Sequence, residues 1–185
     1  RVQVTTNYPL QTTTSTIIYP TKNYNTDGTK ITKHVFAGSQ DVATIEGSGG
    51  AITIYYNSTD QLNSSSVMTD SAGAIAETMD YYPFGALRID NKVGNFAEQR
   101  KYIGQEYDAD TGLNYLNARY YNSNIGRFVS QDPMFWGKLN LTDPQSLNSY
   151  SYANNNPIVG SDPDGLKAYF TPGFAIPFKS LDTAN

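Results

Sequence analysis

Tyr102-Ile103-Gly104-Gln105-Glu106-Tyr107-Asp108 opens the stretch that organises this chain, and Asp162-Pro163-Asp164-Gly165-Leu166 closes it. Between them lie short blocks rich in Gly, Asn, Tyr and Arg: Thr111-Gly112-Leu113, Ala118-Arg119-Tyr120-Tyr121, Ile125-Gly126-Arg127-Phe128-Val129-Ser130, Asp132-Pro133, Leu147-Asn148-Ser149-Tyr150 and Asn155-Asn156-Pro157. Asp, Asn and Gly fix the tight turns that join strands. The stretch therefore predicts a β segment with defined turns, and it contains two Asp-Pro steps thirty residues apart.

Bulk composition narrows the classes of protein. A chain of 185 residues can form one domain with a core, or part of a larger one, and its first residue is Arg1, so we expect a piece of something longer. No apolar run is long enough to cross a bilayer. The net charge is −4 and the Lys and Arg residues are not clustered, which argues against nucleic-acid binding.

The chain has few residues of the types that bind metals or act as nucleophiles, which argues against a bound cofactor. Cysteine is absent, which excludes disulfides, thiol catalysis and Cys-based zinc sites. His34 is the single histidine, so a metal site with two histidines is excluded and a Ser-His-Asp triad is disfavoured. The sequence predicts no cofactor and no metal.

The first half of the chain reads as hairpins. Residues 1–30 are polar and weakly patterned, with a short strand over Ile17–Tyr19 that Pro20 is expected to end. Residues 31–85 alternate strands with Gly turns. Two units of strand, turn, strand and Tyr pair recur there, over Val42–Tyr56 and Val67–Tyr82. Such hairpins bury too little apolar surface to fold alone, so they must stack on neighbours.

The second half is predicted in less detail. Residues 86–97 read as a polar connector, and Glu98–Ile103, Leu113–Tyr121 and Arg127–Val129 read as strands. One or two short helices are expected, both after Pro133, with one over Ser146–Ala153. Of the Tyr pairs 55–56, 81–82 and 120–121, one member of each is expected to face the interior, rather than both stacking on carbohydrate.

The ordered motifs of residues 102–166, with Tyr81-Tyr82-Pro83-Phe84-Gly85 before them, resemble the Rhs-repeat-associated core of bacterial Rhs/YD-repeat proteins. The resemblance implies an all-β fold, in which YD-repeat hairpins of a spiral β-sheet shell end in a core plug. It implies four parts: a poorly patterned N-terminal segment over 1–30, YD hairpins over 31–85, the Rhs-associated core over 86–166, and the start of a variable C-terminal region over 167–185.

Asp132 and Asp162 are the sharpest chemical candidates. Two carboxylates held together cannot easily both ionise, so one can keep a proton while the other activates water for amide cleavage. In the resembled core these two positions form an aspartyl-protease-like pair, the position of Arg119 is also required, and the bond cut would be Leu166–Lys167. The alternative is that each Asp-Pro is only a turn opener. Extra sequence between the two residues, including Phe135–Lys138, sets this chain apart from the resembled pattern.

Two functions of different classes follow. The resemblance implies the C-terminal closing segment of a polymorphic toxin, secreted or on a bacterial cell surface, that cages a C-terminal effector and releases it by autoproteolysis. Its expected partners are upstream YD repeats of the same chain, that effector, and secretion machinery or cell-surface partners. The alternative is a non-cleaving structural cap of a wall-associated or adhesive protein. Nineteen residues follow Leu166, too few for a folded toxin, which fits a truncated record or the second function.

Overall fold

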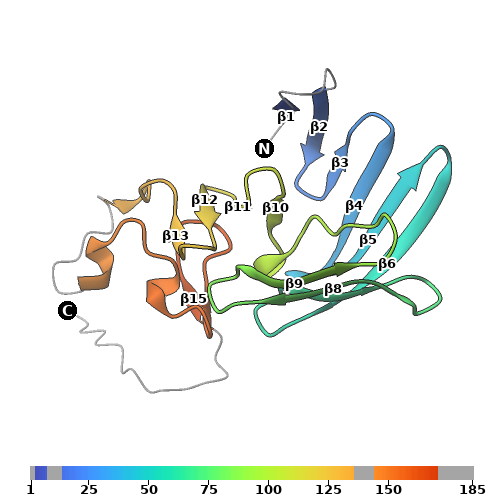
Figure 1. Ribbon diagram of the computed structural model, residues 1–185. Helices are drawn as coiled ribbons and strands as arrows, with labels where there is room; N and C mark the ends of the chain where they lie inside the picture. The colour runs from blue at the N-terminus through green and yellow to red at the C-terminus, as the bar shows by residue number, and fades with distance from the viewer. Residues whose placement is uncertain (1–2, 8–13, 136–143, 171–185) are drawn as a thin grey trace.

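The computed structural model describes residues 3–7, 14–135 and 144–170. Its largest part is an antiparallel sheet of nine strands, in which each strand pairs with its neighbours in the sequence (Figure 1). The strands are β1 (Gln3–Asn7), β2 (Thr14–Thr21), β3 (Tyr24–Thr26), β4 (Lys30–Ala37), β5 (Gln40–Ser48), β6 (Ala51–Thr59), β7 (Ser65–Thr69), β8 (Ile75–Tyr81) and β9 (Leu87–Lys92). The two predicted repeat units are the β5–β6 and β7–β8 hairpins, so that prediction is confirmed.

The turns of this sheet follow from the residues at their tips. Gly28, Gly38, Gly50 and Gly73 all have positive φ, which glycine adopts without a steric penalty. Asp27 and Asp70 accept backbone N–H groups inside their own turns and so fix the turn geometry. Pro20 does not end a strand as predicted. It lies in β2, where the pairing with β3 shifts register between Ile18 and Thr21, and such an irregularity tolerates a residue without an N–H group.

After β9 the chain returns across the inner face of the large sheet. We call residues 93–105 the strap. Phe96 stacks on Tyr55 of β6 with ring centroids 3.7 Å apart, and the Asn25 side chain of β3 donates to Gln99 at 2.6 Å. Lys101 pairs with Glu77 of β8 at 2.7 Å. The predicted polar connector over 86–97 is wrong for its first half, which is β9, and Glu98–Ile103 is part of the strap instead of a strand, because its groups bond to several strands at once.

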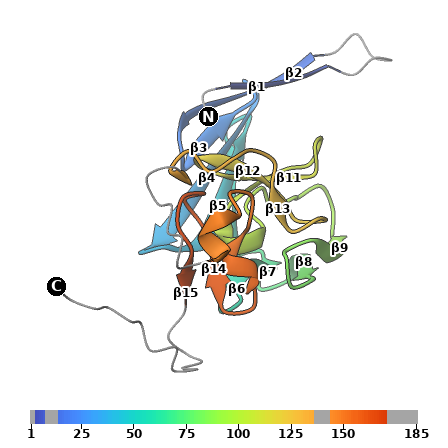
Figure 2. The same cartoon turned by 90° about the vertical axis from the view of Figure 1, so that its left-hand side faces the viewer.

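The chain then forms a smaller unit, which we call the plug (residues 106–135 and 144–170). Its strands are β10 (Glu106–Asp108), β11 (Leu113–Leu116), β12 (Arg119–Asn122) and β13 (Arg127–Phe128) in one sheet, and β14 (Gly160–Ser161) and β15 (Tyr169–Phe170) in another. Seen from the plug side, this unit lies in front of the curled large sheet (Figure 2). The segment predicted as one strand, Leu113–Tyr121, is a hairpin, because Asn117 adopts a left-handed conformation with φ 56°.

The helices that lie wholly within the described residues are short 3-10 turns: η1 (Tyr102–Gly104), η2 (Pro144–Leu147) and η3 (Ala153–Asn155). Two of these short turns, η2 and η3, follow Pro133 as predicted, whereas η1 precedes it. The helix expected over Ser146–Ala153 is wrong, because two separate turns border that segment. The all-β fold class itself is confirmed. No helix among the described residues is long and apolar enough to span a bilayer.

An aromatic cluster joins the plug to the large sheet and the strap. Tyr121 and Tyr152 of the plug are fully buried, with ring centroids 4.3 Å apart, and both lie near Tyr102 of the strap. Tyr81 of β8 packs against the same cluster. In the pairs 55–56 and 81–82 the first Tyr is half-buried and the second is exposed, and Tyr121 is buried beside a half-buried Tyr120. The prediction that one member of each pair faces inward is confirmed.

A substitution at Gly85 can test how closely the strap packs on the β8–β9 hairpin that precedes it. A Cβ at Gly85 would lie 2.4 Å from the Tyr102 ring, and its φ of +84° is strained for any other residue. We expect Gly85→Ala to lower the free energy of unfolding by about 2–5 kcal/mol, from backbone strain and overpacking together. Gly73→Ala is the matched control, because its φ is +81° and its Cβ would meet nothing within 4 Å. Equal losses in urea unfolding of the two variants would contradict the packing.

Candidate functional site

Three segments of the plug meet at one cavity of about 510 Å³. Arg119 is the first residue of β12, Asp132 follows β13, and Asp162 follows β14. Leu166 and Lys167 also line this cavity. The fold therefore brings all five residues singled out by the sequence to one place, although they are up to 48 positions apart.

Arg119 is the centre of this arrangement. Its guanidinium is almost fully buried and lies 3.5 Å from the centre of the Phe128 ring. Nε donates to the Gly165 carbonyl at 2.6 Å, and a terminal nitrogen donates to the Ser149 carbonyl at 3.0 Å. Burial lowers the pKa of Arg119, while the charges of Asp132 and Asp162 act in the opposite direction. The guanidinium thus fixes three chain segments around one positive charge.

The two carboxylates share one guanidinium nitrogen. Nη2 of Arg119 lies 3.4 Å from Asp162 Oδ2 and 3.6 Å from Asp132 Oδ2, so these two oxygens cannot be more than 7.0 Å apart. Asp162 is buried, whereas the Asp132 side chain keeps 17% of its surface exposed toward the cavity. The pair is therefore asymmetric, with one buried and one partly exposed carboxylate.

The Asp162–Gly165 turn presents the Leu166–Lys167 peptide to these carboxylates. Asp162 Oδ1 accepts hydrogen bonds from the backbone N–H groups of Leu166 at 3.0 Å and Lys167 at 3.1 Å. Asp164 Oδ1 accepts from the same two N–H groups at 2.9 and 3.0 Å. Gly165 is required here, because a Cβ would lie 2.4 Å from the Leu116 carbonyl oxygen. The turn is thereby held directly against the β11–β12 hairpin.

The pKa values of Asp162 and Asp164 are shifted in opposite directions. Burial, and then a hydrogen bond with Asp164, raises the pKa of Asp162 to about 6, against the opposing charge of Arg119. Burial also works to raise the pKa of Asp164, but hydrogen bonds from the Leu166 N–H and from Asp162 outweigh it and lower that pKa. Below about pH 6, these shifts describe a protonated Asp162 beside an ionised Asp164.

Sequence reasoning treated Asp164 only as a turn residue. Its place two residues after Asp162, inside Asp-Pro-Asp-Gly, was the available signal, since Asp side chains commonly bond backbone N–H groups two residues on. Phe128 and Ser149 were missed as positioning groups for Arg119, because nothing local in the sequence relates them to it. Phe135, from the extra sequence between Asp132 and Asp162, lines the cavity, whereas Trp136 is outside the described residues.

Comparisons place the chain among shell-forming proteins. A family model described as Teneurin YD-shell matches residues 14–158. Among curated proteins, the chain is 36% identical over 118 residues to the tRNA(Glu)-specific nuclease WapA of Bacillus subtilis subsp. natto, with 59% of this chain and 5% of WapA covered. It is 35% identical over 114 residues to salivary gland surface protein 1 of Aedes aegypti, with 60% of this chain and 3% of that protein covered.

A toxin subunit and a solved complex match as well. The chain is 35% identical over 122 residues to toxin subunit YenC1 of Yersinia entomophaga, with 64% of this chain and 11% of YenC1 covered. In the TcdB2-TccC3 crystal structure, a TM-score of 0.74 at 24% identity covers 90% of this chain and 8% of that one, which shows the fold. The chain thus spans between 3% and 11% of the length of these proteins.

The raised pKa of Asp162 predicts a pH dependence of stability. Because its folded value of about 6 exceeds the ordinary 3.8, the folded chain holds an extra proton between these values. The resulting stabilisation is present at low pH and is lost as the pH rises through about 6. Asparagine does not titrate, so the Asp162→Asn variant lacks this loss. The difference in free energy of unfolding, variant minus wild type, should therefore be about 1–3 kcal/mol larger at pH 8 than at pH 4. Urea unfolding at both pH values measures this.

Asp110→Asn, an exposed change of the same chemistry in the β10–β11 turn, is the control. A difference between Asp162→Asn and wild type that is the same at pH 4 and pH 8 would contradict the assignment.

Proposed function

Since the chain belongs to the Teneurin YD-shell family of Rhs and YD-repeat proteins, we propose that it is the closing segment of such a shell. Its hairpins form the last part of the wall, and its plug covers one end. The sheet supports this proposal because it curls and adds strands strictly in chain order (Figure 1). The plug supports it because its aromatic side chains pack against β8 and the strap.

The proposal assigns each part of the chain to a part of the shell. Residues 1–30 are a partial repeat, residues 31–85 are YD hairpins, residues 86–166 are the Rhs-associated core, and residues 167–185 begin a variable region. The first residues of the core, Leu87–Lys92, also form the last strand of the wall. The wall sheet therefore continues into the first residues of the core, whose other strands form separate sheets.

The partners follow from the same shell. Upstream YD repeats of the full-length chain would pair with β1, whose other edge carries no described strand. An effector following Leu166 would be caged inside, and the full-length protein would be secreted or displayed on a bacterial cell surface, where secretion machinery or surface proteins meet it. YenC1, a toxin subunit, is similar to this chain, which supports the toxin assignment. The net charge of −4 argues against a nucleic-acid partner for this segment.

The second part of the proposal is self-cleavage after Leu166. The observation that carries it is the position of the Lys167 nitrogen, 3.1 Å from Asp162 Oδ1 at a cavity that Asp132 also lines. Asp132, which lies 3.6 Å from Arg119 and is partly exposed, takes a proton from a water molecule as the oxygen of that water attacks the Leu166 carbonyl carbon. Protonated Asp162 gives its proton to the Lys167 nitrogen as the C–N bond breaks. The products are a carboxyl group on Leu166 and an amine on Lys167, so atoms and protons balance.

Arg119 and Asp164 would position the Leu166–Lys167 peptide for this reaction. Arg119 keeps one carboxylate ionised and holds the Gly165 carbonyl, which fixes the peptide before the cut. Asp164 holds the Lys167 N–H and accepts a hydrogen bond from the Tyr169 hydroxyl on the product side. These contacts would keep the peptide in place relative to both acids.

A structural cap without cleavage is the second candidate. Asp132 Oδ1 accepts the Met134 N–H at 2.7 Å, and Asp162 and Asp164 accept two backbone N–H groups each, as turn-capping residues do. Similarity to a salivary gland surface protein shows that relatives include proteins from outside bacteria. In this case the same contacts serve only to close the end of the shell.

Cleavage is tested by expressing the chain with its upstream repeats. We expect mass spectrometry to find a new amino terminus at Lys167, and Asp132→Asn or Asp162→Asn to abolish it. Asp110→Asn should cleave like wild type, and Arg119→Lys should cleave more slowly, because lysine cannot make the three directed contacts. An intact wild-type chain under these conditions would leave the structural cap.

The outer edge of β1, which pairs with no strand among the described residues, gives a separate test of the wall. An exposed sheet edge pairs readily with another chain. We expect the 185-residue chain alone to self-associate at micromolar concentration, and the chain with its upstream repeats to be monomeric. Sedimentation velocity measures both. A compact monomer of the isolated chain would count against its being cut from a longer spiral sheet.

A further inference from the structure

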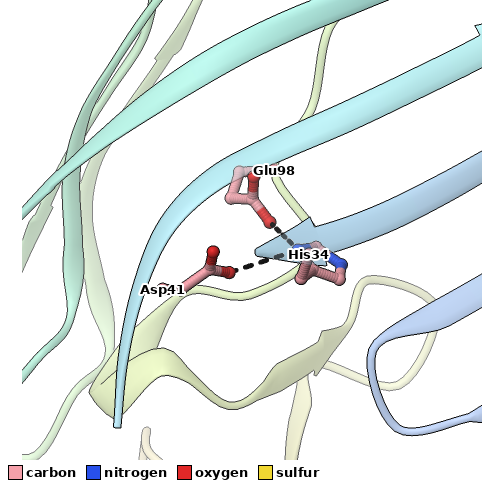
Figure 3. A group of neighbouring side chains, drawn as sticks. All are labelled: His34, Asp41 and Glu98. Atoms are coloured by element: carbon pink, nitrogen blue, oxygen red, sulfur yellow. Dashed lines mark ion pairs between the residues drawn. The ribbon is translucent and has the colours of Figure 1, made fainter. Parts of the chain in front are cut away.

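His34, Asp41 and Glu98 meet on the inner face of the large sheet (Figure 3). They come from β4, β5 and the strap. His34 Nδ1 lies 3.2 Å from Asp41 Oδ2 and 3.5 Å from Glu98 Oε1, and one ligand-type atom from each residue lies within 4.8 Å of the others. All three side chains are at most 2% exposed. This cluster takes no part in the plug site described above.

A β-bulge directs Asp41 into this cluster. His34 pairs with Thr44 across β4 and β5, so regular alternation would put Val42 on the same face and Asp41 on the other. The register shifts instead, with Val35 opposite Ala43 and Phe36 opposite Asp41. The shift turns Asp41 to the inner side, where it is 1% exposed. Bulges of this kind commonly re-aim side chains at functional sites.

The Asp41 carboxylate lacks donors in this position. Neither of its oxygens accepts a hydrogen bond, although its side chain is fully buried. Glu98 differs, because it accepts from the Thr44 hydroxyl at 2.5 Å and from the Arg100 backbone N–H at 2.8 Å. A buried carboxylate without donors is costly, so a native chain normally supplies a cation or a hydrogen bond to it.

We propose that His34 Nδ1, Asp41 Oδ2 and Glu98 Oε1 bind a divalent first-row transition ion, for which Zn²⁺ is the reference. Zinc binds imidazole nitrogen and carboxylate oxygen at about 2.0–2.2 Å, which puts neighbouring ligand atoms of a tetrahedron about 3.3–3.5 Å apart. The His34 distances of 3.2 and 3.5 Å match that spacing. The Thr44 hydroxyl, which donates to the second oxygen of Glu98, orients that ligand in the way second-shell groups do.

Arg100 completes the charge balance. Its guanidinium lies 5.4 Å from the centre of the Phe36 ring, and Phe36 is the cross-strand partner of Asp41. With neutral His34, two carboxylates and Arg100, a divalent ion leaves a net charge of +1. Zinc sites with two histidines and one carboxylate have the same charge. A bound ion would tie the strap to β4 and β5, and so fix the closing segment to the wall.

The competing occupant of the cluster is a proton on His34. An imidazolium would face Asp41 and Glu98 with no metal, and His34 Nδ1 also lies 3.1 Å from the Thr44 hydroxyl. Zn²⁺ and H⁺ compete for the same nitrogen, so one measurement separates them. Histidine ring nitrogen shifts in NMR differ between a metal-bound Nδ1 and an imidazolium, and His34 is the single histidine of the chain.

The test uses the 185-residue chain after dialysis against EDTA. We expect calorimetric titration at pH 7.5 to show one Zn²⁺ per chain, and saturating Zn²⁺ at about 100 times the dissociation constant to raise Tm by about 5–10 °C. Co²⁺ should give the visible absorption of a tetrahedral site. Asp41→Asn should weaken Zn²⁺ binding by at least about tenfold, whereas Asp110→Asn on the surface should bind as wild type does.

Two results on the wild-type chain alone would overturn the proposal, whether or not the variants fold. The first is the absence of stoichiometric Zn²⁺ binding. The second is a His34 imidazolium signal that persists at saturating Zn²⁺. Equal affinities of wild type and a folded Asp41→Asn variant would place any bound zinc elsewhere. None of these outcomes depends on cleavage at Leu166, so this test and that of the proposed function fail independently.

Discussion

The structure depends on covering the inner face of a curled sheet that its own hairpins cannot bury. The strap does this with charged and polar side chains as well as Phe96. Glu77 and Lys101 are both buried and pair at 2.7 Å, and Lys101 also reaches Asp90 at 3.0 Å. Burial, and then a hydrogen bond with Asp90, raises the pKa of Glu77 to about 7, while Lys101 acts against this rise. Removing Lys101 would leave a buried carboxylate without its partner, which is costly.

The same use of paired buried charges recurs in the plug. Arg119 is as buried as Lys101 and also serves several acceptors, so the strap and the plug are each fixed by a buried cation. Directed contacts of this kind specify one arrangement of segments, whereas an aromatic cluster alone tolerates small shifts. The aromatic cluster supplies apolar burial, and Arg119 sets the register of the Asp162–Gly165 turn against β12.

This arrangement makes a shell closure and a reactive site compatible. A turn that is held by two carboxylates and one guanidinium is rigid, which suits a cap. The same groups differ in acidity, since Asp162 has a raised pKa and Asp164 a lowered one, which suits proton transfer.

The sequence by itself determined the β class and the hairpins of β5–β8, because Gly and Asp turns are local signals. The set of residues that meet at the cavity came from the resemblance of the ordered motifs to the Rhs-associated core. The sequence did not determine β9, the strap or the hairpin at Asn117, since polar segments such as Leu87–Lys92 pair only when a neighbouring strand is offered. It also gave no sign that His34, Asp41 and Glu98 would meet. That cluster depends on a one-residue bulge in β5 and on the strap, in which Glu98 lies 54 positions after Thr44. Only the tertiary structure fixes both features, because each depends on contacts between separate segments of the chain.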